Sequence, residues 1–328
     1  MRVLITGGAG FIGSHYARTM LAGGYPGCAD ARVTVLDQLT YAGDTRSLPM
    51  DHPRLRFVHG DVCDPALLRR VVPGHDAVVH CAAESHADRP MNGSAEFIRT
   101  NILGTHTLLE ACRVHRVGPV VVVSTDEVYG PVGQSRRGEG HPPLPDSPYS
   151  ASKAAGDLVA LAYARTHGLD VRVTRGCDTY GPYQHVEQPI PAEVTGLLGG
   201  APPPAPGGDR DPREWVHVDD HCRAVHLVLT RGRAGGVYNV GGGTVLDRAR
   251  LARILAGLCG GVPGPARSVE DGPGGPGADR GRALDDRRIR AELGFRNLVP
   301  FAWGIAETVH WYRSNPGWWE PLLRESVL

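Results

Sequence analysis

A tyrosine and a lysine stand four residues apart in the stretch Tyr149-Ser-Ala-Ser-Lys153, and Lys153 is the only lysine in the chain of 328 residues. Residues four apart on a helix share one face, one turn from each other. A free phenol has a pKa of about 10, and a nearby ammonium lowers that pKa by stabilising the phenolate. The pair is therefore predicted to take a proton from an alcohol as hydride leaves its carbon. The alternative is an ordinary exposed helix face.

Two adjacent carboxylates follow a short apolar run in Thr125-Asp126-Glu127. Two acids in different environments can divide their work, because one stays protonated and donates to a leaving hydroxyl while the other removes a carbon-bound proton. The pair therefore indicates elimination of water beside a ketone, in addition to oxidation. An acidic loop without catalytic work is the alternative.

A glycine-rich turn near the N-terminus predicts a dinucleotide site. Its residues Gly7, Gly10, Phe11, Ile12 and Gly13 lie between an apolar run and a helical stretch. Glycines let the backbone approach a pyrophosphate, and the helix that follows offers unpaired N–H groups to it.

Two further acids fit the same dinucleotide. Asp37 ends the second apolar run and is predicted to bind the adenosine ribose, which favours NAD over NADP because a 2′-phosphate would be repelled. Asp61 and Val62 follow the third run after Gly60, at a position where their groups could contact the edge of the adenine ring.

The elements that must position these residues alternate between strands and helices. The apolar runs 3–6, 33–37, 56–59, 77–80, 120–124 and 171–175 lack the polar alternation of a half-exposed sheet. They predict buried parallel strands with helices on both faces, an α/β doubly wound sheet of the Rossmann type. Apolar residues at helical spacing predict an amphipathic helix over 96–115.

The chain is predicted to form one large domain and one smaller lobe. Residues 1–177 are expected to form the dinucleotide-binding domain, with 214–243 returning to it. Residues 178–328, where Pro- and Gly-rich segments interrupt the rhythm, are expected to form mainly a smaller C-terminal α/β substrate lobe.

Charge and cysteine content restrict the partners. Acidic and basic residues balance at 35 each, so neither nucleic acid nor a membrane surface is predicted as a partner. No apolar run reaches the roughly 18 residues of a transmembrane helix. The seven cysteines form no Cys-x-x-Cys pair or Cys/His cluster, which indicates reduced thiols in the cytoplasm and no metal site. A small-molecule partner is expected.

Together these motifs resemble the extended short-chain dehydrogenase/reductase family, and within it the dTDP-glucose 4,6-dehydratase type. The resemblance covers nearly the whole chain, through ITGGAGFIGSH, LDQLTYAG, VHCAAESHADR, VSTDEVYG, SPYSASKA, YGPYQH, REWVHVDDHCRA and VYNVGGG. The discriminating piece is STDEVYG, because related epimerases and decarboxylases do not normally carry its Asp-Glu pair.

The resemblance implies a role for each catalytic residue. Tyr149 would deprotonate the glucose C4 hydroxyl as hydride passes to NAD, with Lys153 holding the nicotinamide ribose and Thr125 bonding the C4 oxygen. Glu127 would remove the C5 proton while Asp126 protonates the departing C6 hydroxyl, and hydride would return to C6.

The resemblance also implies binding residues and an assembly. NAD would contact Ala82, Ala83 and Ser124 besides the glycine turn, Asp37, Asp61, Val62, Tyr149 and Lys153. The nucleotide sugar would contact Ser85, His86, Asp178, Thr179, Glu187, Arg213 and Asn239. Members of this type form homodimers through helices that match 96–115 and 149–166, and they serve deoxysugar biosynthesis, including that of antibiotics.

The segments that would hold the nucleotide sugar depart from the family pattern. Asp178 stands where relatives carry Asn, and residues 186–191 read Val-Glu-Gln-Pro-Ile-Pro instead of Pro-Glu-Lys-Leu-Ile-Pro. In residues 275–282 the arginine and histidine expected at the nucleotide are missing in the family's register, although Arg280 or Arg282 could replace one of them after a small slip, and Pro90-Met91 replaces Ser-Ile. An aspartate near a diphosphate is unfavourable unless it points away.

Two alternatives therefore stay open beside a dTDP-glucose 4,6-dehydratase. One is a related NAD-dependent dehydratase, epimerase or oxidoreductase on another nucleotide sugar or activated polyol. The other is an NAD-binding homologue with little or no turnover that acts as a partner subunit. Arg213 and Asn239 could each be structural instead of substrate-binding.

Overall fold

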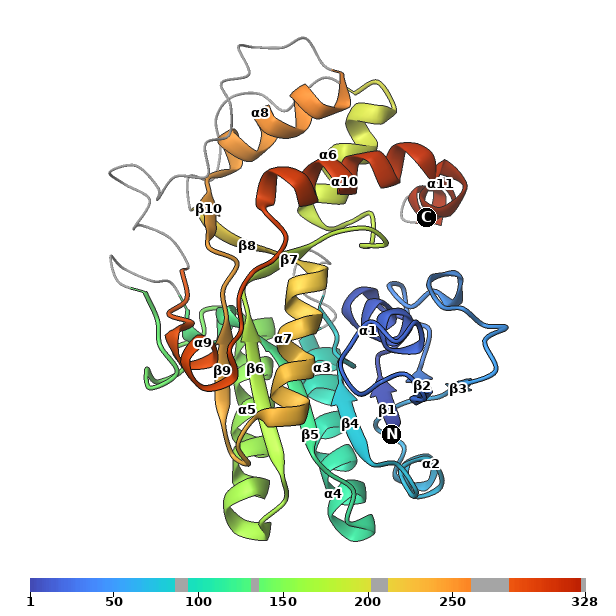
Figure 1. The fold of residues 1–328 in the computed structure, drawn as a ribbon, viewed down its shortest axis with the longest axis vertical. Coiled ribbons are helices and arrows are strands. Elements are labelled where there is room, and N and C mark those ends of the chain that lie inside the picture. Colours follow the sequence, from blue (N-terminus) through green and yellow to red (C-terminus); the bar gives the residue numbers. More distant parts are fainter. Residues whose placement is uncertain (86–93, 131–135, 202–211, 261–282, 326–328) are drawn as a thin grey trace.

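A computed structural model of the chain describes residues 1–85, 94–130, 136–201, 212–260 and 283–325 (Figure 1). Within these residues the main sheet has seven strands in the order β3-β2-β1-β4-β5-β6-β9, and every neighbouring pair is parallel. The strands are β1 (Arg2–Thr6), β2 (Arg32–Asp37), β3 (Leu55–His59), β4 (Ala77–His80), β5 (Val120–Thr125), β6 (Val171–Gly176) and β9 (Val237–Val240). The predicted Rossmann-type sheet and its six predicted strands are confirmed.

The strands form where apolar residues can be buried on both faces of the sheet. Val3 and Ile5 pack into one hydrophobic cluster, whereas Leu4 between them packs into the cluster on the other face. Successive side chains of a strand point to opposite faces. A continuous apolar run is therefore the pattern of a strand covered on both sides.

Helices cover both faces. Apolar residues of α1, α7 and α9 belong to one of these clusters, and apolar residues of α2, α4 and α5 belong to the other. The bounds are α1 (Phe11–Leu21), α2 (Pro65–Val71), α3 (Ser94–Phe97), α4 (Thr105–His115), α5 (Pro148–His167), α7 (Val218–Arg231) and α9 (Arg287–Leu293), with short 3₁₀ turns η1 (Thr45–Ser47) and η4 (Asp126–Tyr129).

A second group of elements is stacked above the main sheet in Figure 1. In the described residues it contains a three-stranded sheet in the order β10-β8-β7 and a hydrophobic cluster shared with four helices. Its members are β7 (Asp178–Tyr180), β8 (Arg213–His217), β10 (Thr244–Leu246), α6 (Pro189–Leu198), α8 (Arg248–Cys259), α10 (Phe301–Ser314) and α11 (Pro316–Glu325).

The two groups interleave along the chain in a way that differs in detail from the predicted boundaries. β9 joins the main sheet and α7 packs against it, as expected of 214–243, but β8 pairs with β7 in the small sheet. Conversely, α9 packs against β9 although it lies within 178–328. The division into a cofactor domain and a substrate lobe stays a prediction.

The predicted helix over 96–115 contains a π-helical segment, η3 (Ile98–Gly104), between α3 and α4. The side chain of Asn101 exchanges hydrogen bonds with the backbone of Glu84 and donates to Ser152 Oγ at 2.8 Å. Thr105, which follows this segment, is buried, whereas Ile98 is 54% exposed. The apolar stripe is thus divided between the core and the surface.

The cysteine thiols are all free, and in the described part of the chain no group of three or more His, Cys, Asp or Glu side chains could hold a metal ion. None of the described helices is long and apolar enough to cross a membrane. Burial raises the pKa of Cys81, beside the cavity described below, to about 12. That thiol is therefore neutral at physiological pH.

Candidate active site

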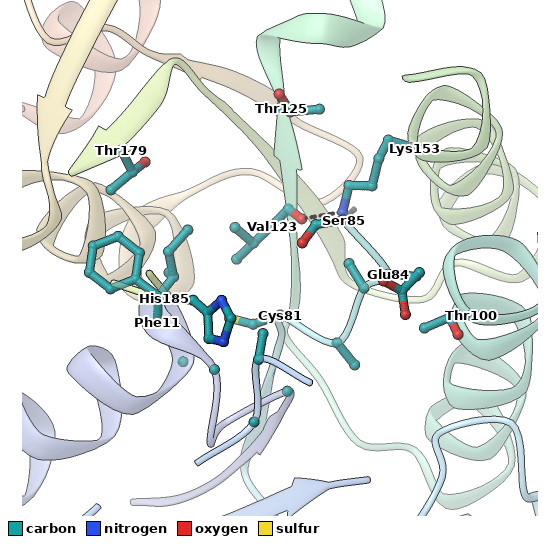
Figure 2. A pocket seen from close by; sticks show the side chains of 18 of the residues that line it. Phe11, Cys81, Glu84, Ser85, Thr100, Val123, Thr125, Lys153, Thr179 and His185 are labelled. Atoms are coloured by element: carbon teal, nitrogen blue, oxygen red, sulfur yellow. Dashed lines mark hydrogen bonds between the residues drawn. The ribbon is translucent and has the colours of Figure 1, made fainter. Parts of the chain in front are cut away.

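A cavity of about 340 Å³ opens where β1, β2, β4, β5 and β6 end (Figure 2). Ligands of open α/β sheets bind at this carboxyl edge. Most of the predicted site residues line it: Gly7, Gly10, Phe11, Ile12, Gly13, Asp37, Val62, Ala82, Ala83, Ser85, Ser124, Thr125, Glu127, Tyr149, Lys153, Asp178 and Thr179. One cavity thus unites the predicted dinucleotide turn with the predicted acid–base residues.

Two positions of the glycine turn, 7 and 13, accept no residue larger than glycine. A Cβ on Gly7, whose φ is +67°, would lie 2.4 Å from the backbone nitrogen of Ala82. A Cβ on Gly13 would lie 2.3 Å from the carbonyl oxygen of Gly7. The first glycine lets the turn lie against the chain that follows β4, and the second lets α1 begin directly against the turn.

Asp37 connects the end of β2 to this turn. Its carboxylate accepts hydrogen bonds from the backbone N–H groups of Ala9 and Leu39, both at 2.8 Å. Burial raises the pKa of Asp37 above its ordinary value, while these donors favour the carboxylate and partly offset that effect. The acid is held at the cavity wall in the place predicted for a ribose ligand.

Tyr149 and Lys153 are positioned by the start of α5. Ser147 caps this helix in a capping box: its hydroxyl accepts from the Ser150 N–H at 3.1 Å, and Ser150 Oγ accepts from the Ser147 N–H at 3.0 Å. Because the first turn is fixed in this way, Tyr149 lies in it and Lys153 follows one turn later. Figure 2 shows Lys153 reaching the carbonyl oxygen of Val123, to which Nζ donates at 2.8 Å.

The pKa of Tyr149 differs from the sequence-based expectation. Lys153 was predicted to lower it, but the pKa is raised, first by burial and then by the negative charges of Glu127 and Asp126. Burial lowers the pKa of Lys153 itself, and Asp157 opposes that effect. In this structure the ammonium is bonded to the β5 backbone, so it does not offset the two carboxylates beside the phenol.

Thr125, the last residue of β5, and the two acids that follow it divide between the cavity and the core. Thr125 caps the 3₁₀ turn η4, accepting from the Glu127 N–H and donating to Asp126 Oδ1, both at 3.2 Å. Thr125 and Glu127 line the cavity, whereas Asp126 is only 7% exposed and does not. The two predicted acids therefore have different environments, one open to the cavity and one behind Thr125.

Four other predicted binding residues do not line the cavity: Asp61, Glu187, Arg213 and Asn239. Asp61 accepts from the Cys63 N–H at 2.7 Å and forms an ion pair with Arg99. Glu187 lies 3.7 Å from His185 Nδ1, and Arg213 forms an ion pair with Asp178 at 3.4 Å.

Asn239, a predicted substrate contact, is held by hydrogen bonds within the protein. It is fully buried, its Oδ1 accepts from the Tyr129 hydroxyl at 2.9 Å, and its Nδ2 donates to the carbonyl oxygens of Arg137 and Asp285. These bonds hold β9 to neighbouring segments, which is the structural alternative for this residue. His86 and residues 275–282 lie outside the described residues.

Several cavity residues were not predicted from the sequence. They are Gln38, Thr40, Cys81, Glu84, Thr100, Cys177, Gln184, His185, Gln188 and His221. Gln38, Cys81 and Cys177 directly follow strands, so their position at the carboxyl edge could have been inferred. His221 lies on α7, and it reaches the cavity only because that helix packs against β5 and β6.

Comparisons with known proteins agree with this geometry. The NAD dependent epimerase/dehydratase family model matches residues 3–241. A dTDP-glucose 4,6-dehydratase of Streptomyces niveus is 51% identical over 98% of this chain and 96% of that protein, and one of Streptomyces griseus is 51% identical over 98% and 97%.

Solved structures are similarly close. DesIV, a dTDP-glucose 4,6-dehydratase from Streptomyces venezuelae with NAD and TYD bound, is 53% identical, with a TM-score of 0.89 over 98% of this chain and 100% of that one. A UDP-glucose 4-epimerase of Thermotoga maritima with UDP-glucose is 28% identical, with a TM-score of 0.83 over 96% and 100%. From its glycine turn to the end of β9, the chain belongs to the NAD dependent epimerase/dehydratase family.

Proposed function

We propose that the protein is an NAD-dependent dTDP-glucose 4,6-dehydratase, which converts dTDP-glucose to dTDP-4-keto-6-deoxyglucose. The observation that carries the proposal is the single cavity shared by the glycine turn, Asp37, Thr125, Glu127, Tyr149 and Lys153. Full-length relatives at 51% identity have this activity. A 4-epimerase needs no base for the C5 proton, so the cavity-facing Glu127 favours the dehydratase over a 4-epimerase.

The residues present fit NAD. Gly7 and Gly13 permit the close backbone packing that brings the turn against the start of α1, and the unpaired N–H groups at a helix start suit a pyrophosphate. Asp37 would bind the adenosine ribose and Lys153 the nicotinamide ribose. When bound, NAD takes up hydride from C4 of the sugar, returns it to C6, and brings a positively charged ring to the site.

The side chains of the chain would move the protons. Tyr149 takes the proton of the C4 hydroxyl, whose oxygen is hydrogen-bonded by Thr125. The C4 ketone acidifies the C5 proton, which Glu127 removes. Asp126, whose carboxyl accepts a hydrogen bond from Thr125 in this structure, would turn toward the cavity and protonate the C6 hydroxyl, which leaves as water. A proton then returns to C5 as hydride reaches C6.

The substrate lobe supports a nucleoside diphosphate despite its departures from the family pattern. Asp178 would repel a diphosphate by itself, but it forms an ion pair with Arg213 at 3.4 Å. The negative charge is thereby balanced inside the site. We assign Ser85, Asp178 and Thr179 to the sugar-nucleotide side of the cavity, with residues 178–328 as the main substrate lobe.

The proposal is tested by incubating the protein separately with dTDP-glucose, UDP-glucose and GDP-mannose. Loss of one water from dTDP-glucose alone, seen as an 18 Da mass decrease without net NADH, is the expected result. Reaction of only another nucleotide sugar favours the related dehydratase, and NAD binding without any turnover favours the partner subunit.

A double variant tests the acid–base assignment. Asp126→Asn/Glu127→Gln keeps Tyr149 and Lys153 but removes both groups that eliminate water. We expect it to oxidise C4 and accumulate NADH without forming the dehydrated sugar. Dehydration at the normal rate would contradict the assignment.

We also propose a cytoplasmic homodimer that acts in deoxysugar biosynthesis, including that of antibiotics. The free thiols are typical of a reducing compartment. On the segments predicted to form the dimer interface, Ile98, Leu103 and Leu158 are 54%, 48% and 52% exposed. Large apolar side chains gathered on two neighbouring helices suit burial against a second copy.

A further inference from the structure

A buried histidine that the reaction scheme does not use lies in the cavity wall. His221, in the first turns of α7, is 2% exposed and lines the cavity. Its Nε2 is buried without a hydrogen-bond partner among the described residues. Because a buried polar atom without a partner costs free energy, such an atom on a ring that lines a cavity is a candidate for a ligand contact.

The ring of His221 is fixed from its other side. Nδ1 is 2.7 Å from Thr179 Oγ1, and the same hydroxyl lies 3.2 Å from the carbonyl oxygen of Cys177. A Cβ on Gly176 would lie 2.6 Å from the imidazole, so the ring packs directly on the end of β6. These contacts hold Nε2 in one place before any ligand arrives.

The strand register places His221 level with the reacting atoms. Gly176, against which the ring packs, pairs with Thr125 on the neighbouring strand β5. Adjacent strands are about 4.8 Å apart. In Figure 2, Thr179 and Phe11 lie on one side of the cavity and Lys153 on the other. Hydride transfer requires the nicotinamide ring to lie beside C4 of the sugar, whose oxygen Thr125 would hydrogen-bond. The ring would therefore lie between Lys153 and His221.

The chemistry of the imidazole selects an amide as its partner. Burial lowers the pKa of His221 to about 4, so the ring is neutral at physiological pH. Because the Thr179 hydroxyl donates its proton to the carbonyl oxygen of Cys177, Nδ1 is the donor to Thr179 Oγ1, and Nε2 of the neutral ring is an acceptor. The N–H group of a carboxamide can donate to this nitrogen, whereas a phosphate can only accept.

We propose that His221 Nε2 hydrogen-bonds the carboxamide of the nicotinamide ring of NAD and thereby sets the orientation of that ring. The inference rests on the proposed function, because it takes NAD as the occupant of the cavity. It gives the chain a positioning residue on α7, opposite the lysine that would hold the ribose.

Two substitutions separate this contact from the packing of the ring. Asn at position 221 can keep a bond near Nδ1 to Thr179 but has nothing that reaches toward the cavity, whereas Gln can place its amide near Nε2. We expect His221→Asn to weaken NAD binding about tenfold, the effect of one lost hydrogen bond, and His221→Gln to retain most of the affinity.

The measurement is calorimetric titration of the full-length chain with NAD, ADP-ribose and ADP. ADP-ribose lacks the nicotinamide, so its affinity should be the same in wild type and both variants. Unchanged NAD affinity in His221→Asn would overturn the inference. So would equal losses in both variants, or a parallel loss for ADP-ribose, because these indicate ring packing or a phosphate contact. Failure of the wild type to bind NAD would instead refute the proposed function.

Discussion

Lysine and arginine carry the same charge, so an exchange at position 153 tests the shape of the cation. The Lys153 side chain is partly buried and its Nζ donates to Val123 O at 2.8 Å, and a larger planar guanidinium cannot take the same place. We expect Lys153→Arg to lower kcat by about 100-fold or more, since small misplacements at a reacting centre have effects of that size. The readout is steady-state turnover of dTDP-glucose.

A matched exchange on the same helix controls for stability. Arg165 is exposed near the end of α5, and Arg165→Lys should leave kcat and the thermal midpoint unchanged. If Lys153→Arg also turns over at a near-normal rate, the lone lysine has no special geometric role.

The phenol of Tyr149 should respond to the carboxylate beside it. Glu127 raises the pKa of Tyr149, second only to burial. Since the base must be deprotonated, removal of that negative charge favours the phenolate and lowers the pKa. In Glu127→Gln we expect the rising limb of the pH profile for NADH formation to move to lower pH, by on the order of one unit.

Rapid mixing with dTDP-glucose at a series of pH values measures the rate of NADH formation before water is eliminated, and so gives the position of this rising limb. Asp178 is a smaller cause of the same pKa rise, so Asp178→Asn should move the limb in the same direction by less. A limb that stays in place in Glu127→Gln would show that Tyr149 is not the titrating base.

At the scale of elements, sequence patterns predicted the features that depend on residues close together in the chain. The strands were predictable because their apolar runs need burial on both faces. The π-helical segment η3 was not, because Asn101 bonds to residues 17 and 51 positions away. The hydrogen bonds of Asp61 and Asn239 could not be predicted for the same reason, because their partners Arg99 and Tyr129 are 38 and 110 residues distant.

Helix α5 is joined to β6 by a buried ion pair one helical turn after Lys153. Asp157 Oδ2 is 2.9 Å from Arg175 Nε, and the side chains are only 1% and 3% exposed. Arg175 also lies over the Tyr129 ring, 4.8 Å from its centroid. Removal of one partner leaves the other charge buried, so Asp157→Asn should lower the free energy of unfolding by about 3–5 kcal/mol.

Urea unfolding of both single variants and of the double variant Asp157→Asn/Arg175→Met measures the coupling. We expect the double variant to be destabilised by clearly less than the two single effects added together, because it leaves no unpaired charge. Simple additivity would mean that the two groups act independently. The exposed pair Arg113–Glu110 on α4 offers a comparison, and its loss should have little effect.

At the scale of the whole molecule, the sequence predicted which chemistry meets at one place, but not every side chain that takes part. Parallel strands bring their carboxyl ends to one edge, so residues after separate strands were expected together, and most of them do line one cavity. His221 reaches that cavity from a helix packed on the sheet, and such packing depends on contacts distant in sequence. Local motifs thus predict the cavity residues at the carboxyl edge of the sheet better than those, such as His221, that a packed helix contributes.

The last prediction concerns the proposed dimer. Leu158 on α5 and Ile98 on η3 are about half exposed, and a charge at either position would be buried unpaired between two copies. We expect Leu158→Glu and Ile98→Glu to shift sedimentation from dimer toward monomer. Leu298→Glu is the matched control, since Leu298 is 69% exposed outside these helices and should not change assembly. A dimer that survives both helix variants would place the interface elsewhere on the molecule.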